Sequence, residues 1–191
     1  PLEVICRHHL AGSGWRRYQK GEVGAEEFGF DAGTVLEEGV KLPVPYLEVS
    51  TKFEAFDRLL DTEEALQISG LSADELDAIK EVVLKVDAII DREAAKNGLI
   101  HVDGKKEFAL GPDRIPVLVD SFGTLDEDRW WDREAYERGE IVQLSKEFVR
   151  GHYIENGHHK ELYDARADGL KEPSIPALPQ SMIERTATLY A

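Results

Sequence analysis

The sequence predicts an α+β fold, an antiparallel sheet flanked by helices, from three observations. A long helical segment, 73–96, is followed directly by two strand-like segments, 99–110 and 115–122, with only a short turn between them. The chain opens with another β-prone segment, 2–7, and its last third reads as helical. Strands joined by tight turns, with helices grouped before and after them, are typical of α+β domains. The 191 residues are enough for one domain with a substantial core or for two small lobes.

The segment that follows the first strand is rich in turn residues. Gly12 and Gly14 supply turn chemistry directly after the strand, and the stretch up to residue 50 holds only short β-like pieces. Pro43 and Pro45 exclude a helix interior there. Asp61 is expected to cap a short helix that runs to about residue 68.

The helix 73–96 is the clearest element of the sequence. Ser72 and Glu75 form a capping box at its start, and Gly98 follows as a stop signal. Apolar residues recur at helical spacing along one face, which predicts that this face packs on a large surface: Leu76, Ile79, Val82, Val83, Val86, Ile89 and Ile90.

The two strands after this helix predict a hairpin around the turn sequence GPDR, residues 111–114. A four-residue loop would place Lys105 opposite Asp120. Because side chains alternate along a strand, Ile100, Val102 and Phe108 are expected on one face, and the opposite face carries His101, Asp103, Lys105 and Glu107. After an acidic, aromatic loop, helices are expected near 132–138, 145–155 and 180–191, the last one behind a proline-rich connector, 172–179.

Composition excludes some classes of function. The formal charge is −15, from 38 acidic and 23 basic side chains, so the chain lacks the basic footprint of a general nucleic-acid or anionic-membrane binder. No apolar run approaches the ~18 residues of a membrane span, and no signal peptide is recognised. Cys6 is the single cysteine, which fits a reducing, cytoplasmic setting. The sequence begins in a strand and stops within a helical pattern, so we expect a fragment of a longer protein; whether it forms a homo-oligomer stays open.

The charged strand face has two interpretations. It could be a solvated edge with surface ion pairs of little energetic value. Alternatively, its carboxylates hold a hard cation such as Mg²⁺ while the lysine holds a phosphate or carboxylate. The apolar flanks of both strands favour an internal position, where buried charges need partners.

Other charged motifs are weaker by themselves. Arg7 and the backbone N–H groups near Gly12 and Ser13 could form an anion-binding nest or only a strand end with a turn. Asp126, Asp128 and Arg129 could be a helix-capping acid cluster with a surface arginine, and Lys146 and Arg150 share one helix face.

Zinc is disfavoured for the histidine pairs 8–9 and 158–159, because neighbouring strand residues face opposite ways and no spaced cysteine or histidine completes a set. The sequence contains neither a P-loop nor a G-x-S-x-G nucleophile elbow.

Several of these motifs together resemble the SAICAR synthetase family. PLEVICRHHLAGS, residues 1–13, is similar to its first signature, and VDGKKEF, 102–108, to its second. In the second motif Lys106 replaces an apolar residue and Ala109 replaces a glycine. VLVDSFGTLDEDRWWD, 117–132, and the two C-terminal helical motifs also match, so the resemblance spans nearly the whole chain in the family's order.

The resemblance implies an ATP- and Mg²⁺-dependent ligase of purine biosynthesis. Such an enzyme joins L-aspartate to the carboxylated aminoimidazole ribonucleotide, CAIR, and releases ADP and phosphate; the CAIR carboxylate is activated as an acyl phosphate before the amine attacks. The fold implied is the larger of two lobes over residues 1–191, with the N-terminal lobe that covers ATP, and the end of the C-terminal helix, outside the chain.

The resemblance also implies a role for each candidate residue. Catalytic roles fall to Lys105 and Asp103, and metal binding to Glu107, Asp120 and Asp103. The nucleotide would be contacted by Lys52, Lys105, Glu107 and Asp120. CAIR and aspartate would be held by Arg7, Ser13, Asp57, Asp126, Arg129, Lys146 and Arg150. Two alternatives remain: a non-catalytic ribonucleotide-binding module derived from the family, and a generic acidic Mg²⁺-binding domain.

Overall fold

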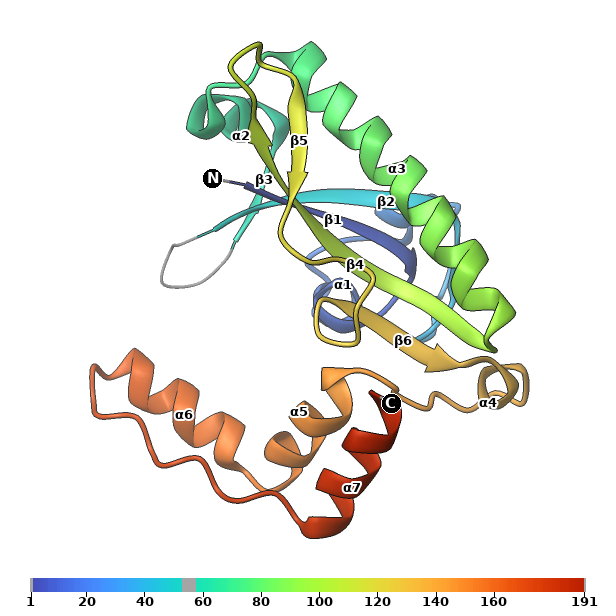
Figure 1. Ribbon diagram of the computed structural model, residues 1–191, viewed down its shortest axis with the longest axis vertical. Helices are drawn as coiled ribbons and strands as arrows, with labels where there is room; N and C mark the ends of the chain where they lie inside the picture. Colours follow the sequence, from blue (N-terminus) through green and yellow to red (C-terminus); the bar gives the residue numbers. More distant parts are fainter. Residues whose placement is uncertain (1, 53–57, 191) are drawn as a thin grey trace.

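The structure is a computed structural model that describes residues 2–52 and 58–190. It confirms an α+β fold, built on one curled, antiparallel sheet of six strands (Figure 1). The strands are β1 (Leu2–His9), β2 (Lys41–Thr51), β3 (Leu59–Leu60), β4 (Leu99–Leu110), β5 (Pro116–Val119) and β6 (Asp128–Asp132). The helices are α1 (Gly12–Gln19), η1 (Ala25–Phe28), α2 (Thr62–Ser69), α3 (Ala73–Lys96), α4 (Arg133–Glu137), α5 (Lys146–Glu155), α6 (His158–Ala167) and α7 (Gln180–Leu189).

The strands follow the order β3-β2-β1-β4-β5, and β6 pairs with the first half of β4. Strand β4 is therefore central: β1 runs along one edge, while β5 and β6 share the other. Helix α3 lies across one face of this sheet, and α5, α6 and α7 form a separate group beyond β6 (Figure 1). On the opposite face of β1 and β4, residues of α1 and of α5 border the sheet.

Helix α3 forms as its sequence predicts. The Ser72 side chain accepts a hydrogen bond from the Glu75 N–H, and the Glu75 carboxylate accepts one from the Ser72 N–H, which completes the capping box. Its residues Ile79 and Val83 pack on Val4 and Cys6 of β1. The short helix α2 is also confirmed, with Asp61 as its N-cap.

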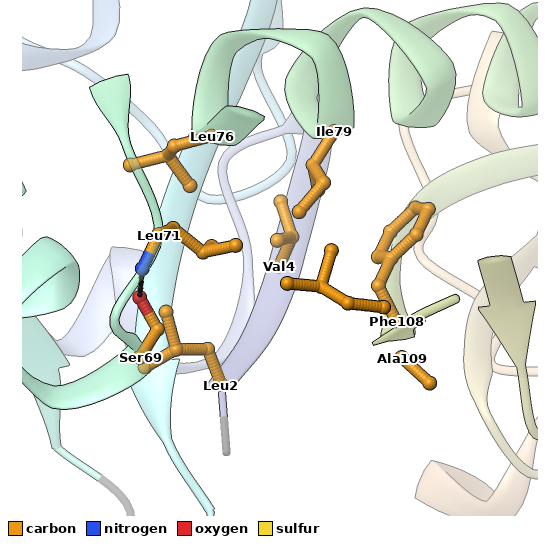
Figure 2. A pocket seen from close by; sticks show the side chains of 9 residues that line it. Leu2, Val4, Ser69, Leu71, Leu76, Ile79, Phe108 and Ala109 are labelled. Atoms are coloured by element: carbon orange, nitrogen blue, oxygen red, sulfur yellow. Dashed lines mark hydrogen bonds between the residues drawn. The ribbon is translucent and has the colours of Figure 1, made fainter. Parts of the chain in front are cut away.

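An apolar pocket of about 200 Å³ opens where the start of α3 meets the sheet (Figure 2). Ile79 points toward Val4, and Leu76 lies on the side of Leu71. Among the described residues that line the pocket, Ser69 alone has a polar side chain, and its hydroxyl accepts the Leu71 N–H at 3.2 Å. A lining of this kind offers packing but little acid–base or ionic chemistry, so the candidate site lies elsewhere.

Four expectations about the elements were wrong. The stretch up to residue 50, expected to hold short β-like pieces, contains most of the 11-residue strand β2. The segment 12–19, predicted as a turn, is helix α1, and its Trp15 and Tyr18 pack on a small core around Leu10 and Phe28. Helix α6 was not predicted, and the aromatic segment 128–132, predicted as a loop, is strand β6. The segment 128–132 becomes a strand because it pairs with β4. It is too short for its hydrophobic periodicity to have indicated a strand.

The hairpin register also differs by one residue from the prediction. The loop contains five residues, 111–115, instead of four, so that Glu107 pairs with Val119 and Leu110 with Pro116. Continued along the strand, this register sets Ser121, and not Asp120, opposite Lys105. Strand β5 ends at Val119, because Asp120 adopts a left-handed backbone with φ 66°.

Strict alternation along β4 fails near its start. The pairing with β6 shifts between His101 and Asp103, which marks a β-bulge. His101 therefore stacks on Trp130 on the α3 side of the sheet instead of lining up with Asp103. Ile100 and Val102 pack together with Trp131, away from Phe108, which joins the core under α3.

Candidate functional site

Three charged side chains form a row across the middle of the sheet. Arg7 on β1 and Arg129 on β6 are the two cross-strand neighbours of Asp103 on β4. Side chains that pair across neighbouring strands project from the same face, so all three meet. Oδ2 of Asp103 accepts hydrogen bonds from Nη1 of Arg7 at 2.9 Å and from Nη1 of Arg129 at 3.0 Å.

Arg7 is almost fully buried and has further partners. Its Nε donates to Oε2 of Glu48 at 2.7 Å, and its Nη2 donates to the Ser13 hydroxyl at 2.8 Å. Burial by itself would lower the pKa of Arg7, but Glu48 and Asp103 reverse this effect and the pKa is raised. Arg7 is thus a fixed cation at the base of the site.

Helix α1 begins beside this arginine. Its N-cap, Ala11, provides no side-chain cap, so the first backbone N–H groups keep their donor capacity next to the Ser13 hydroxyl. Gly12 has φ +56°, and a Cβ at this position would stand 2.5 Å from Nη1 of Arg129. Only glycine leaves room for that guanidinium. The helix start, Arg7 and Arg129 together form a cationic end of the site.

Lys105 lies one row further along β4, among acids. Its ammonium is 3.1 Å from Glu3, 3.3 Å from Glu127 and 3.7 Å from Glu107. Partial burial lowers the pKa of Lys105, but the carboxylates of Glu3 and Glu127 outweigh it, so that the pKa is raised and the lysine stays charged. Glu107 also forms an ion pair with Lys52. This is the acidic end of the site.

A cleft of about 230 Å³ lies between the sheet, α1 and α5. The cleft brings together many of the predicted residues from distant parts of the sequence: Arg7, Ser13, Asp103, Lys105, Arg129, Lys146 and Arg150. Sequence reasoning missed Arg16, Glu127, Ser145 and Glu147, which also line it. Glu127 and Glu147 carried no signal beyond their nearness to the predicted Asp126, Arg129 and Lys146.

The remaining candidates lie at the margin or outside. Asp126 is exposed and 3.7 Å from Lys146, and Lys52 and Glu107 border the acidic end. Asp120 is exposed, and its carboxylate accepts the Ser121 N–H at 2.8 Å. Asp57 lies outside the described residues.

The acidic end contains oxygen atoms that fit a hard cation. Oε1 of Glu107 and Oε2 of Glu127 are buried and, among the described residues, accept no hydrogen bond. The Lys105 ammonium is 3.7 Å from the Glu107 oxygen and 3.3 Å from the Glu127 oxygen, so both contacts are longer than a close hydrogen bond. Carboxylate oxygens in such a setting are the ligands that Mg²⁺ prefers.

No helix in the described part of the chain is long and apolar enough to cross a bilayer.

Comparisons with known proteins agree on one family. The SAICAR synthetase family model matches residues 1–165. Phosphoribosylaminoimidazole-succinocarboxamide synthases from Thermoplasma acidophilum and Thermoplasma volcanium are 49% and 48% identical over 190 residues. These alignments cover all of this chain and 64% of each relative, so the chain spans a little under two thirds of their length.

Solved structures show the same likeness. A SAICAR synthase from Saccharomyces cerevisiae, described as complexed with SAICAR, superposes with a TM-score of 0.72 at 26% identity and covers 100% of this chain and 57% of its own. A SAICAR synthetase described as in complex with ADP gives a TM-score of 0.63 at 29% identity, covering 92% of this chain and 65% of its own.

Proposed function

The chain belongs to the SAICAR synthetase family, and from this premise we propose that its parent protein joins L-aspartate to CAIR with ATP and Mg²⁺. The 191 residues would form the larger lobe of that enzyme and hold CAIR and the metal, with the cover of the ATP site supplied by sequence outside this chain. The observation that carries the proposal is the polarity of the cleft: a cationic end at Arg7 and Arg129, and an acidic end around Lys105.

The cationic end suits a phosphorylated ribose. Arg7, Arg129, the Ser13 hydroxyl and the free N–H groups of α1 are donors for phosphate oxygens. Lys146 and Arg150 of α5 stand on the opposite wall, within reach of further anionic groups of CAIR or aspartate. The likeness to a structure complexed with SAICAR supports this assignment.

The acidic end suits the metal and the ATP phosphates. Glu107 and Glu127 present carboxylate oxygens, and Asp103 stands between the two ends. Asp120 directly follows Val119, the cross-strand partner of Glu107. When bound, Mg²⁺ would neutralise phosphate charge during transfer to the CAIR carboxylate. Lys105 keeps its charge among these acids and would hold the transferred phosphoryl oxygens in place. The aspartate amine would then attack the acyl carbon, forming the C–N bond and releasing a proton, while the C–O bond to phosphate breaks; the products are the amide and phosphate.

The test uses the full-length protein with CAIR, L-aspartate, ATP and Mg²⁺, and measures ADP release. We expect turnover that needs all three substrates and falls at least 100-fold in Asp103→Asn, with Asp77→Asn on the exposed side of α3 as a matched control. The 191-residue chain alone is expected to bind CAIR weakly without releasing ADP. Robust ADP release from the chain alone would contradict the division between lobes, and CAIR binding without turnover in the full-length protein would favour a non-catalytic binding module.

A further inference from the structure

A second group of charged side chains lies on the other face of the sheet, sealed beneath α3. It comprises Cys6, His8, Asp87, His101, Lys106 and Asp128, and we call it the buried cluster. The side chains of Asp87, His101, Lys106 and Asp128 have no exposed surface. The cleft and the buried cluster meet at Asp128, which is fully buried at its side chain and is also among the residues that line the cleft.

Lys106 is the cation that joins the two carboxylates of the buried cluster. Its ammonium forms an ion pair with Asp87 of α3 and lies 3.8 Å from Oδ2 of Asp128. Removing an ammonium from water costs several kcal/mol unless anions compensate it, so these two contacts are what allow a lysine at this position.

Asp128 is held firmly on this side of the sheet. Oδ2 accepts the Gly123 N–H at 2.9 Å and lies 3.2 Å from Nε2 of His101. The carboxylate lies directly over Gly104, where an added Cβ would clash with Oδ1. The missing side chain at Gly104 is what gives the carboxylate its place, and the Gly123 contact closes the loop that leads from β5 to β6.

The two neighbours of Asp128 in the chain face the cleft. Glu127 contacts Lys105 at 3.3 Å, and Arg129 donates to Asp103 at 3.0 Å. Because a strand alternates its side chains, the position of Asp128 on one face determines where Glu127 and Arg129 stand on the other.

We propose that Lys106 is a positioning residue: through Asp128 it holds the segment 123–129, and with it Glu127 and Arg129, at the wall of the cleft. The claim that Lys106 holds the loop does not depend on which ligand the cleft binds. The claim that this affects ligand binding rests on the proposed function. Lys106 and Asp87 themselves lie outside the cleft lining.

A metal ion is a competing occupant of the cluster, because the ligand atoms of Cys6, His8 and Asp87 lie within 4.8 Å of one another. The Lys106 ammonium already lies against the Asp87 carboxylate, so a positive charge is supplied there by the chain itself. Burial, and then Asp87, raise the pKa of the Cys6 thiol, so a metal ion would have to displace its proton as well as the Lys106 ammonium. The cation of this cluster is thus a lysine.

The test compares Lys106→Met with Asp87→Asn in the full-length protein by native-state hydrogen exchange. Both variants break the Lys106–Asp87 pair, but only the first also removes the contact to Asp128. In Lys106→Met we expect exchange at the Gly123, Glu127 and Asp128 amides to rise about tenfold or more beyond the change in the β1–β2 ladder, because the buried Asp128 carboxylate loses the ammonium 3.8 Å away. In Asp87→Asn the loop should change no more than that ladder.

Affinity for ribose 5-phosphate, measured by calorimetry well below the unfolding temperature, gives the second readout. Lys106→Met should weaken it about fivefold or more, and Asp87→Asn less than twofold, the scale of an indirectly displaced charge contact. If the unaltered protein does not bind ribose 5-phosphate, the assignment of the ribose phosphate to the cationic end is contradicted, while hydrogen exchange still tests the loop.

If Lys106→Met does not fold, Asp128→Asn replaces it, since the amide oxygen keeps an acceptor for Gly123 and loses the charge facing Lys106. It should show the same local rise in exchange. Equal changes in the loop and the ladder in these variants, or a loop change as large in Asp87→Asn, would overturn the proposal.

Discussion

Lys105 and Lys106 are neighbours on strand β4, yet they stand in opposite environments. Lys105 faces the cleft, is 32% exposed at its side chain, and lies among three carboxylates that are more than 3 Å away. Lys106 faces α3, has no exposed surface, and is locked between Asp87 and Asp128. The first lysine can exchange its partners for a ligand, whereas the second cannot. The strand's alternation therefore separates a binding function from a structural one at adjacent positions.

The largest expected effect concerns function at Lys105. In the full-length protein, Lys105→Met should lower turnover at least 100-fold, because a preorganised cation at the acidic end is lost. Its effect on the free energy of unfolding should be about 1 kcal/mol or less, since partly exposed ion pairs contribute little. Steady-state assays and urea unfolding measure the two quantities. Near-normal turnover would show that Lys105 only balances the charges of the surrounding acids.

Lys106→Met should, in contrast, have a large effect on the free energy of unfolding. It leaves two buried carboxylates without their ammonium, so the free energy of unfolding should fall by about 3–5 kcal/mol. The double variant Lys106→Met/Asp87→Leu, which replaces the pair by apolar side chains, should recover a large part of this loss. Urea unfolding of the two variants provides the measurement. A loss as small as that of Lys105→Met would mean that water reaches the buried cluster.

His9 extends the comparison to a buried titratable group beside aromatic rings. It is 5% exposed, edge-on to Trp131 and Tyr136 at 5.5 Å. Burial first, and then the charge of Lys41, lower its pKa to about 4. The folded state favours the neutral form of His9. The contribution of His9 to the free energy of unfolding is therefore complete above pH 6.5 and is lost as the pH falls toward 4.

This contribution is on the order of 3 kcal/mol across that range. Unfolding measured at pH 7, 5.5 and 4 should therefore show a shallower pH dependence in His9→Phe than in the unaltered protein. Parallel curves for the two proteins would contradict the assignment to His9.

The two sides of β4 also differ in how far the sequence could predict them. The cleft residues come from recognisable motifs, so Arg7, Asp103, Lys105 and Arg129 could be chosen before the structure, and the capping box identified the start of α3. The buried cluster could not be predicted. Lys106 was interpreted only as a departure from a motif, because its partners Asp87 and Asp128 are set by the packing of α3 and by the pairing of β6.

Local irregularities account for the other errors. One extra residue in the 111–115 loop moved the register of β5, and a bulge beside Val102 moved His101 to the α3 side. Neither changes the hydrophobic pattern enough to be seen in the sequence. Predictions that depend on a register are therefore weaker than those that depend on a motif.

The smallest effect is expected at the rim of the cleft, where Lys146 is 39% exposed and 3.7 Å from Asp126. Lys146→Met should weaken binding of ribose 5-phosphate by about two- to fivefold at low salt, because an exposed charge acts through water. The difference should nearly vanish at about 0.5 M salt, where screening shortens the reach of such charges to a few Å. Lys160→Met on α6, 80% exposed and outside the cleft lining, is the matched control and should show no change. A tenfold loss that persists at high salt would instead place Lys146 in direct contact with the ligand, and the cationic end would then extend from Arg7 across to α5.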